Sequence, residues 1–218
     1  VSTRLVGAVI MAHGDDKGLR LPPKIAPHQV VMVPIAKNEN GHLKVREFIS
    51  PVLDEMRKGG IRIYEDWSDN SPGFKFNEWE MKGVPLRLEV GPRDIESGQA
   101  VLVRRDTGEK IILEKNMITE QAPRLLEEIQ KGLFEQALTF REKNTHEVSS
   151  YSNFRDTIKN KGGFIRCGWD GTQKTEMKIK EDTNATIRCI LNNEDLSGMK
   201  CVYSGNPAKH VVIYGKAY

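Results

Sequence analysis

The sequence predicts an α/β fold, in which a mixed sheet flanked by helices is followed by a smaller α+β domain. Apolar runs and period-two stretches, which indicate strands, alternate with helical stripes over roughly the first half of the chain. A hairpin signal, DTGE between two apolar runs, closes this series. A long amphipathic stripe then precedes three further strand-like runs. The order strand, helix, strand, helix and then strands favours a mixed sheet with right-handed crossovers.

Residues 1–27 are predicted to form a short block that cannot fold alone. Helical spacing predicts a helix from Thr3 to His13, capped by Ser2 or Thr3, and a proline-containing linker after it. The helix dipole opposes a cation at this start, so Arg4 hints weakly at an anionic partner. The polar residues that follow are interpreted as linker structure: His13, Asp15 and Asp16.

Residues 28–118 are predicted to form the first domain around a buried strand at Val30–Ile35. The helical stripe after it contains Pro51, so the helix either kinks there or begins at Ser50–Pro51. The remaining expected elements are a strand at Ile61–Tyr64 and a hairpin of Ala100–Arg104 with Lys110–Leu113.

The stretch from Phe74 to Asp94 is the one around which we expect a binding site. Pro72 and Gly73 precede a helix that Gly83 ends, and period-two apolar residues then predict a strand up to Val90. A carboxylate accepts from the Watson–Crick N–H groups of guanine, arginine donates to O6 and N7, and phenylalanine stacks on a splayed base. Residues of these types could converge on one sheet edge: Phe76, Glu80, Arg87 and Asp94. The competing interpretation is a half-buried strand with ordinary surface charges.

Residues 119–218 are predicted to form the last domain, with the boundary near Thr119. A long helix after Thr119 carries an apolar stripe from Leu126 to Phe140, which we interpret as packing against a neighbouring domain. Three strands and one polar helix are expected beyond it: Gly163–Cys167, Ala185–Leu191, Val211–Tyr214 and, between the first two, Glu176–Asp182.

Composition limits the possible classes of protein. The 33 basic and 30 acidic residues give a net charge of +3, so nucleic-acid binding would depend on local patches. No apolar run suits a membrane span, and the start is too short and too quickly acidic for a signal peptide. Three cysteines cannot all pair, which favours a reduced, cytoplasmic setting. Since the chain begins without Met, we expect a piece of a longer protein.

Three separated stretches carry a family resemblance. One reads KFNEWEMKGVPLRLEVGPRDIESGQAVLVRR and resembles the anticodon-binding domain of archaeal/eukaryotic-type prolyl-tRNA synthetases. The opening, STRLVGAVIMAHGDDKGLRLPPKIAPHQVVMVPI, resembles the end of that family's catalytic domain with class II motif 3, and VVIYGKAY resembles its C-terminal tail. The resemblance implies the class IIa anticodon-binding fold for residues 28–118. Residues 1–27 would end a catalytic domain, and residues 119–218 would be a zinc-binding-like C-terminal domain.

The same resemblance implies a ligase that uses ATP and Mg²⁺ to join L-proline to tRNA(Pro) through prolyl-adenylate, and that is a homodimer at full length. Motifs 1 and 2 would lie upstream, so we assign no catalytic residue and expect this chain alone not to aminoacylate. Arg4 falls on the motif 3 arginine that holds ATP, with Ser2 and Thr3 beside it. Tyr218 falls on a terminal tyrosine that reaches toward the active site.

For tRNA recognition, the resemblance implies that Phe76 packs on an anticodon base and that Glu80 and Arg87 bind guanine. Asp94 would accept from the neighbouring guanine. Phosphate contacts are expected from basic residues, for which a solvated face is equally open: Arg93, Arg104, Arg105 and Lys110. The family often has a lysine near Glu109, for which Lys110 would stand in.

Zinc is not expected, although many family members hold it with two cysteine pairs. The corresponding positions here are Asp170, Thr175, Cys201 and Ser204, of which only the cysteine is a good zinc ligand. Trp169 and the Asp170–Thr172 turn are candidates to replace the metal. The alternative is a rearranged site made by Cys167, Cys189, Cys201 and His210.

Two other interpretations of the whole chain stay open. It could be a stand-alone anticodon-domain module that binds RNA without catalysis, which leaves the motif 3 and tail stretches without a purpose. It could also be a purely structural domain whose charges are solvated surface.

Overall fold

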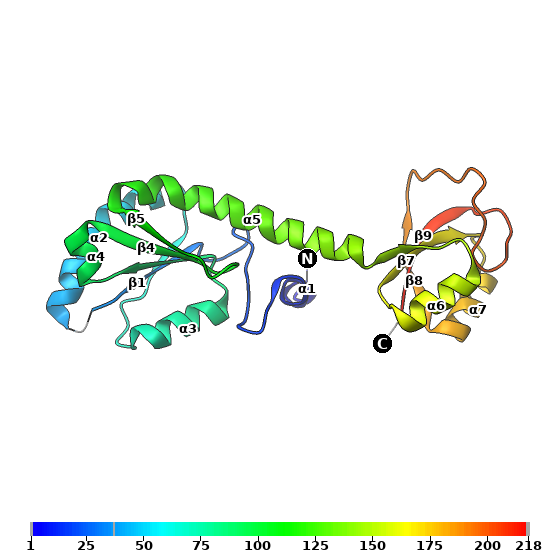
Figure 1. The fold of residues 1–218 in the computed structure, drawn as a ribbon, viewed down its shortest axis with the longest axis horizontal. Coiled ribbons are helices and arrows are strands. Elements are labelled where there is room, and N and C mark those ends of the chain that lie inside the picture. Colours follow the sequence, from blue (N-terminus) through cyan, green and yellow to red (C-terminus); the bar gives the residue numbers. More distant parts are fainter. Residues whose placement is uncertain (1, 37, 217–218) are drawn as a thin grey trace. The chain divides into compact units, whose positions relative to one another are not determined.

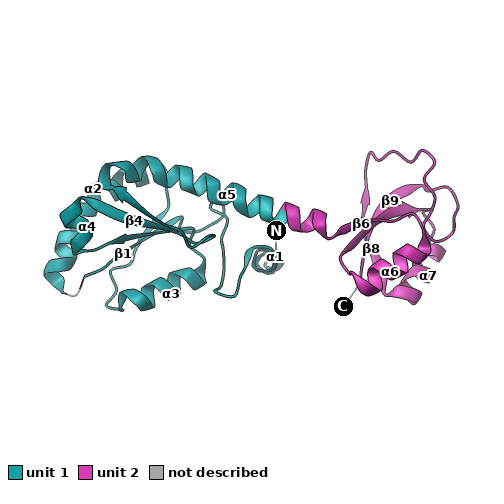
Figure 2. Cartoon of the chain, in the orientation of Figure 1, with its two compact units in different colours: residues 1–137 teal, residues 138–218 magenta. Residues whose placement is uncertain are grey.

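The computed structural model describes residues 2–36 and 38–216, and it divides into two units, Val1–Ala137 and Leu138–Tyr218 (Figure 2). Each unit has its own mixed sheet with helices, so the predicted α/β class is confirmed. The division falls inside helix α5 (Ile118–Lys143). The predicted domain boundary near Thr119 lies at the start of this helix and stays a prediction.

The sheet of unit 1 has five strands in the order β2-β1-β3-β4-β5 (Figure 1). Strand β1 runs parallel to β2 and β3, whereas β4 is antiparallel to β3 and β5. The strands are β1 (Val30–Pro34), β2 (Ile63–Glu65), β3 (Leu86–Val90), β4 (Gln99–Arg104) and β5 (Lys110–Glu114). The other elements are α1 (Arg4–His13), α2 (Glu39–Lys58), α3 (Pro72–Lys82), α4 (Pro92–Ser97) and the 3₁₀-helix η1 (Lys115–Met117).

Helices cover both faces of this sheet, which explains the continuous apolar sequence of its central strand. All five residues of β1 are buried. Val30 and Met32 belong to the core shared with α2 and α5, whereas Val31 and Val33 pack with Trp79 of α3 on the other face. A strand buried on both faces has no polar side, as the run at Val30–Ile35 predicted.

Helix α2 runs through Pro51 without ending. It begins after Asn38, whose side chain accepts a hydrogen bond from Gly41 N at 2.9 Å. The alternative start at Ser50–Pro51 is therefore wrong. Val45 and Ile49, which precede the proline, are fully buried, so packing of the first half outweighs the hydrogen bond that the proline removes.

The block of residues 1–27 docks on the end of α3. The expected helix forms as α1, although its N-cap residue Thr3 makes no side-chain capping bond, and none of its residues is buried. The linker after it donates backbone hydrogen bonds from Leu19 to Met81 O at 3.0 Å and from Leu21 to Gly83 O at 3.1 Å.

Gly83 is required where the linker meets α3, because its φ is 75° and a Cβ there would lie 2.5 Å from Leu19 O. Replacing Gly83 by alanine is expected to lower the free energy of unfolding by about 3 kcal/mol, through left-handed strain and this clash. Gly98→Ala is the control, since φ is 68° and no described atom lies within 4 Å of its Cβ site. Its loss should be about 1 kcal/mol. Urea unfolding measures the free energy of unfolding of both variants. Equal losses for Gly83→Ala and Gly98→Ala would contradict a close contact between Gly83 and Leu19.

Unit 2 has four strands in the order β6-β7-β9-β8. They are β6 (Thr145–Glu147), β7 (Phe164–Trp169), β8 (Ala185–Leu191) and β9 (His210–Lys216), with helices α6 (Tyr151–Asn160) and α7 (Gln173–Thr183). The three predicted strands and the polar helix are all present. Helix α6 and strand β6 were not predicted, because both are short and carry few apolar residues. The core of this unit includes Phe154, Ile179 and Tyr214.

The apolar stripe of α5 is buried only in its first part. Leu126, Ile129 and Leu133 lie in the core of unit 1, whereas Phe140 is 71% exposed. In the described part of the chain, no helix is both long and apolar enough to cross a membrane.

Candidate nucleic-acid interface

A cavity of about 190 Å³ in unit 1 brings together residues from elements far apart in the sequence. It lies where the end of α3 meets β3, the β4–β5 hairpin and the turn before residue 18. Several predicted RNA contacts line it: Glu80, Arg87, Arg104, Arg105 and Lys110. Lys17 lines it as well. Of the four residues expected to converge, Glu80 and Arg87 line this cavity, whereas Phe76 and Asp94 do not.

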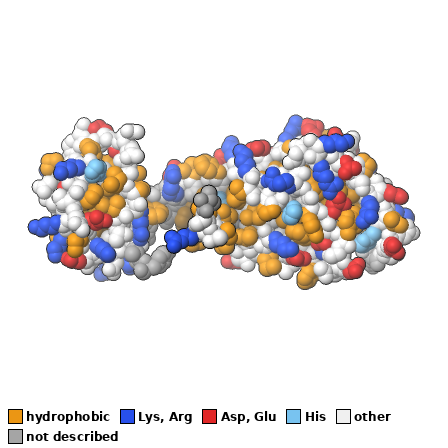
Figure 3. All heavy atoms as spheres, turned by 180° about the vertical axis from the view of Figure 1, so that it is seen from behind, with side chains coloured by type: hydrophobic (Ala, Val, Ile, Leu, Met, Phe, Trp, Pro, Cys, Tyr) orange, Lys and Arg blue, Asp and Glu red, His pale blue; other side chains and the backbone are white. Residues whose placement is uncertain are grey.

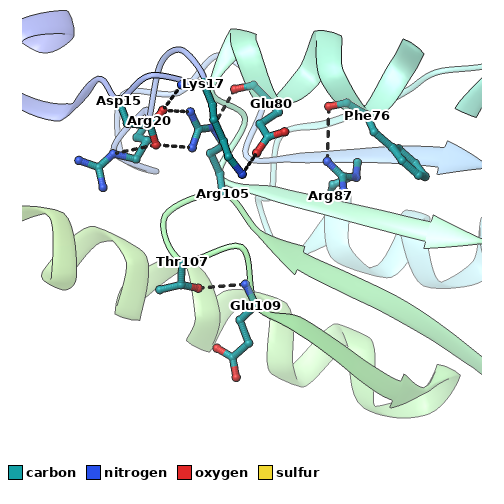
Figure 4. Close-up of polar contacts among 9 residues, drawn as sticks. All are labelled: Asp15, Lys17, Arg20, Phe76, Glu80, Arg87, Arg105, Thr107 and Glu109. Carbon is teal, nitrogen blue, oxygen red and sulfur yellow. Dashed lines mark hydrogen bonds and ion pairs between the residues drawn. The ribbon is translucent and has the colours of Figure 1, made fainter. Parts of the chain in front are cut away.

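Phe76 and Arg87 form a stacked pair beside this cavity (Figure 4). The guanidinium carbon of Arg87 lies 4.3 Å from the ring centroid of Phe76. Arg87 Nε donates to Glu89 Oε1 at 2.8 Å, and Nη1 lies 3.5 Å from the carbonyl oxygen of Phe76. The ring fixes one face of the guanidinium and the carboxylate fixes its edge, so the arginine is oriented before any ligand arrives.

Glu80 stands at the end of α3 and lines the cavity, and its carboxylate points toward the Lys17 ammonium (Figure 4). Its side chain is 31% exposed, and Oε1 accepts from Lys17 Nζ at 3.1 Å. Its backbone carbonyl accepts from Arg105 Nε at 2.7 Å. The helix end is therefore fixed while the carboxylate stays accessible to an incoming hydrogen-bond donor.

Arg105 holds the site together and does not face solvent. Its terminal nitrogens donate to both oxygens of Asp15 at 2.8 and 2.6 Å, and only 5% of its side chain is exposed. These hydrogen bonds lower the pKa of Asp15 to about 2. The structure does not support the predicted phosphate contact of Arg105, because its donors are used within the protein. Asp15 has the linker role that the sequence suggested.

Arg104 is also held internally, by Asp106 at 2.9 Å and Glu128 at 3.0 Å, and only 12% of its side chain is exposed. A phosphate contact from Arg104 is likewise unsupported. Lys110 is exposed on β5 and lines the cavity, so its phosphate contact stays a prediction. Arg93 is exposed on α4 and is not among the cavity residues.

Asp94 does not line the cavity. Its carboxylate accepts from Gly91 N at 2.7 Å and so caps the start of α4. The sequence Gly-Pro-Arg-Asp is compatible with this capping role, because Pro92 suits a first helical turn. A guanine contact from Asp94 stays a prediction.

The face of the molecule that Figure 3 shows carries charges of both signs. In Figure 3 basic and acidic side chains are interspersed over the visible surface of both units, as the small net charge indicates.

The residues predicted to hold ATP are Ser2, Thr3 and Arg4, and all three are exposed around the start of α1. Nothing in their surroundings tests the prediction. Tyr218 lies outside the described residues.

In unit 2, the four positions that correspond to zinc ligands are occupied mainly by a hydrogen-bonded cluster around Asp170. One carboxylate oxygen accepts from Thr175 Oγ1 at 2.9 Å and from Ser204 Oγ at 2.7 Å. The other accepts from the backbone N and the hydroxyl of Thr172 at 3.0 and 2.9 Å. Burial is the largest single effect on Asp170 and favours protonation, but these hydrogen bonds together outweigh it and lower its pKa to about 2.

Trp169 does not join this cluster, since its indole N–H has no hydrogen-bond partner among the described residues. Cys201 and Cys167 are buried thiols, and burial raises the pKa of Cys167 to about 12. Within residues 2–36 and 38–216, no group of three or more His, Cys, Asp or Glu side chains could hold a metal. The Asp170–Thr172 turn is therefore the candidate that forms the replacement contacts.

Two residues of the interface were not predicted. Glu89 is buried on β3 and orients Arg87, and its alternation with apolar neighbours gave no sign of that role. Lys17 lies in a linker more than sixty residues before Glu80. Only the tertiary structure brings Lys17 and Glu80 together.

Two family models and several curated proteins match this chain. The family described as "Anticodon binding domain" matches residues 29–129, and "Prolyl-tRNA synthetase, C-terminal" matches residues 151–218. Three curated relatives named Proline–tRNA ligase match the whole chain. They come from Lachnospira eligens (48% identical), Prosthecochloris aestuarii (50%) and Porphyromonas gingivalis (47%). The chain spans 44–46% of the length of these relatives.

The fold and the matched regions define an anticodon-binding domain followed by a family-specific C-terminal domain. The chain belongs to the prolyl-tRNA synthetase family. The match includes residues before 28 and after 118, which the stand-alone module would leave unexplained.

Proposed function

We propose that this chain reads the proline anticodon of tRNA through Phe76, Glu80 and Arg87. The observation that supports this most strongly is the preoriented Phe76–Arg87 stack beside the accessible carboxylate of Glu80. Proline anticodons carry guanine at their last two positions. Glu80 accepts from the N1–H and N2–H groups of one guanine, and Arg87 donates to an acceptor of a guanine base.

Rejection of other bases follows from the same groups. Uracil or adenine in place of guanine leaves the Glu80 carboxylate or the Arg87 guanidinium without its partner inside the interface. Phe76 adds stacking on a splayed base, which is tolerant of sequence. Specificity therefore lies with the charged pair, and Phe76 contributes general affinity.

The whole protein is proposed to join L-proline to tRNA(Pro) in the cytoplasm, with ATP and Mg²⁺, as a homodimer. Arg4, with Ser2 and Thr3, would contact ATP, since a guanidinium both stacks on adenine and donates to phosphate. Tyr218 would lie near that active site. A proline-dependent ATP–pyrophosphate exchange signal from these 218 residues alone would contradict the proposal that the catalytic groups lie elsewhere in the protein.

The test is a titration of the chain with tRNA(Pro) and with a copy in which both anticodon guanines are replaced. Arg87→Ala should weaken binding to the first RNA by about 1–3 kcal/mol and leave binding to the second almost unchanged. Arg124→Ala is the control, because Arg124 is an exposed arginine on α5 that pairs only with Glu120 among the described contacts.

Repeating the titration at two salt concentrations separates phosphate contacts from base contacts, because phosphate contacts alone give a steep salt dependence. Equal affinity of the unmodified chain for both RNAs would refute anticodon reading by this cavity.

A further inference from the structure

Lys17 lies outside the region that matches the anticodon-binding family, yet it lines the same cavity as Glu80 and Arg87. Its ammonium nitrogen is 3.1 Å from Glu80 Oε1 (Figure 4). Its side chain is 67% exposed. An ion pair this exposed adds little to the stability of the fold, so the contact has no evident structural purpose.

The backbone that carries Lys17 is nevertheless tightly held. Asp15 and Gly18 exchange two backbone hydrogen bonds at 3.0 and 3.1 Å, and Asp15 Oδ1 accepts from Lys17 N at 3.0 Å. Gly18 has φ of 131°, and a Cβ there would lie 2.5 Å from Met81 O, so the turn sits directly against the end of α3. Lys17 is therefore at the tip of a fixed turn.

Arg105 anchors this turn and Glu80 together. Its guanidinium binds the Asp15 carboxylate with two nitrogens and the backbone carbonyl of Glu80 with the third. One buried side chain thus sets the position of Lys17 relative to Glu80. The spacing of the ammonium and the carboxylate is a property of the folded unit.

A cation beside a carboxylate matches the Watson–Crick edge of guanine. That edge presents the acceptor O6 next to the donors N1–H and N2–H. Cytosine binds it with a donor next to acceptors, and Lys17 with Glu80 offers the same order. Adenine would place its N6–H₂ donors against the ammonium, which is a repulsive contact of the kind that creates specificity.

We propose that Lys17 donates to O6 of the guanine whose N1–H and N2–H groups bind Glu80, which makes it a further specificity-determining residue. This inference rests on the proposed anticodon function. On binding, the Lys17 ammonium exchanges part of its contact with Glu80 for the base oxygen, and Glu80 gains the two base donors.

The experiment uses the full 218-residue chain and anticodon stem-loop RNAs. Each anticodon guanine is replaced in turn by 6-thioguanine, which keeps N1–H and N2–H₂ but has sulfur, a weak acceptor, at position 6. The variant is Lys17→Met, which keeps the length of the side chain and removes its donors. Lys24→Met is the control, since Lys24 is an exposed lysine of the same linker that does not line the cavity.

At one of the two positions, 6-thioguanine should weaken binding to the unmodified chain and to Lys24→Met by about tenfold. For Lys17→Met, the unsubstituted RNA should bind about tenfold more weakly, and 6-thioguanine should change its affinity less than twofold. Lys17→Arg, which retains donors, should recover most of the sulfur sensitivity.

If 6-thioguanine weakens binding of Lys17→Met as much as binding of the unmodified chain, Lys17 does not contact O6 and its proposed role is wrong. Anticodon reading would still stand in that case, provided that both proteins bind RNA with the anticodon guanines more tightly than RNA in which they are replaced. If the unmodified chain binds RNAs with and without the anticodon guanines equally well, the proposed function itself is refuted. Circular dichroism of Lys17→Met checks that the turn substitution leaves the fold unchanged.

Discussion

Replacing Asp66 by alanine is expected to lower the free energy of unfolding of unit 1 by about 3–5 kcal/mol. Asp66 and Lys75 are 4% and 1% exposed, and Lys75 Nζ lies 3.8 Å from Asp66 Oδ1. The carboxylate also accepts from Trp79 Nε1 at 2.7 Å and from Ser68 Oγ at 2.6 Å. Its removal leaves the buried indole N–H without its acceptor and the buried ammonium without a counter-charge, since the ammonium keeps only its 2.9 Å hydrogen bond to the backbone carbonyl of residue 66.

The comparison with Lys75→Met identifies the cause. Methionine has similar length and no charge, and Asp66 keeps its hydrogen bonds from Ser68 and Trp79. Lys75→Met should therefore cost about 2 kcal/mol less than Asp66→Ala. Glu78→Ala, which breaks only the exposed pair with Lys82 on the same helix, should cost less than about 0.5 kcal/mol. Chemical unfolding, and separately hydrogen exchange of the β1 and β3 amides, measures the stability of the three variants. Similar losses in the free energy of unfolding for all three would contradict a buried network.

Asp66 also matters for the candidate interface, because it binds Lys75 of α3, and the same helix carries Phe76 and Glu80. The buried contacts hold the first turns of this helix on β1 and β2. We expect Asp66→Ala to weaken RNA binding as well as stability, although Asp66 is not among the cavity residues.

Asp170→Ala is the second large effect, with an expected loss of about 3–4 kcal/mol in the free energy of unfolding of unit 2. Asp170 is 5% exposed and accepts four hydrogen bonds from Thr172, Thr175 and Ser204. These bonds tie the start of α7 to the segment before β9, so the substitution leaves several buried donors unpaired.

The control in the same unit is Asp195→Ala. Asp195 is exposed and accepts from Ser197 N at 2.9 Å, so its loss should cost less than about 1 kcal/mol. Hydrogen exchange of the β7 and β9 amides reports the stability of unit 2. Protection that is equal in Asp170→Ala and in the unmodified chain would show that the cluster does not hold this unit together.

The contribution of Asp170 should depend on pH. Its folded-state pKa of about 2 lies below the ordinary value of 3.8. The ionised carboxylate therefore stabilises the fold fully at pH values above 3.8. The contribution is lost as the pH falls from about 4 toward 2. The difference in unfolding midpoint between the unmodified chain and Asp170→Ala should shrink over this window, and a constant difference would contradict an ionised Asp170.

Local pattern was sufficient for most elements of both sheets. The run at Val30–Ile35, the glycine that ends α3 and the DTGE hairpin each specify one local conformation, and each forms as expected. Helix α2 is the exception among the long elements, since the local effect of Pro51 is outweighed by burial of Val45 and Ile49. Burial depends on the rest of the fold, so the residues around the proline could not decide between the two starts.

The interface divides in the same way. Phe76, Glu80 and Arg87 are close in the sequence, and the family resemblance singled them out. Glu80 and Arg87 line the cavity, and Phe76 lies against Arg87. Arg104 and Arg105 are of the same chemical type, but their donors are used by partners inside the protein, and Asp94 caps α4. Whether a charge faces solvent or a buried neighbour depends on side-chain contacts that spacing does not encode.

The sequence by itself determined the α/β class and the family. These follow from periodicity, glycine and proline positions, and motifs along a continuous stretch. The tertiary structure decided which charges remain available and which are used for folding. It placed Lys17 beside Glu80 through Arg105, and it assembled the Asp170 cluster from segments more than thirty residues apart. The physical reason is that electrostatic partners and burial are set by distances in space, which only the folded chain fixes.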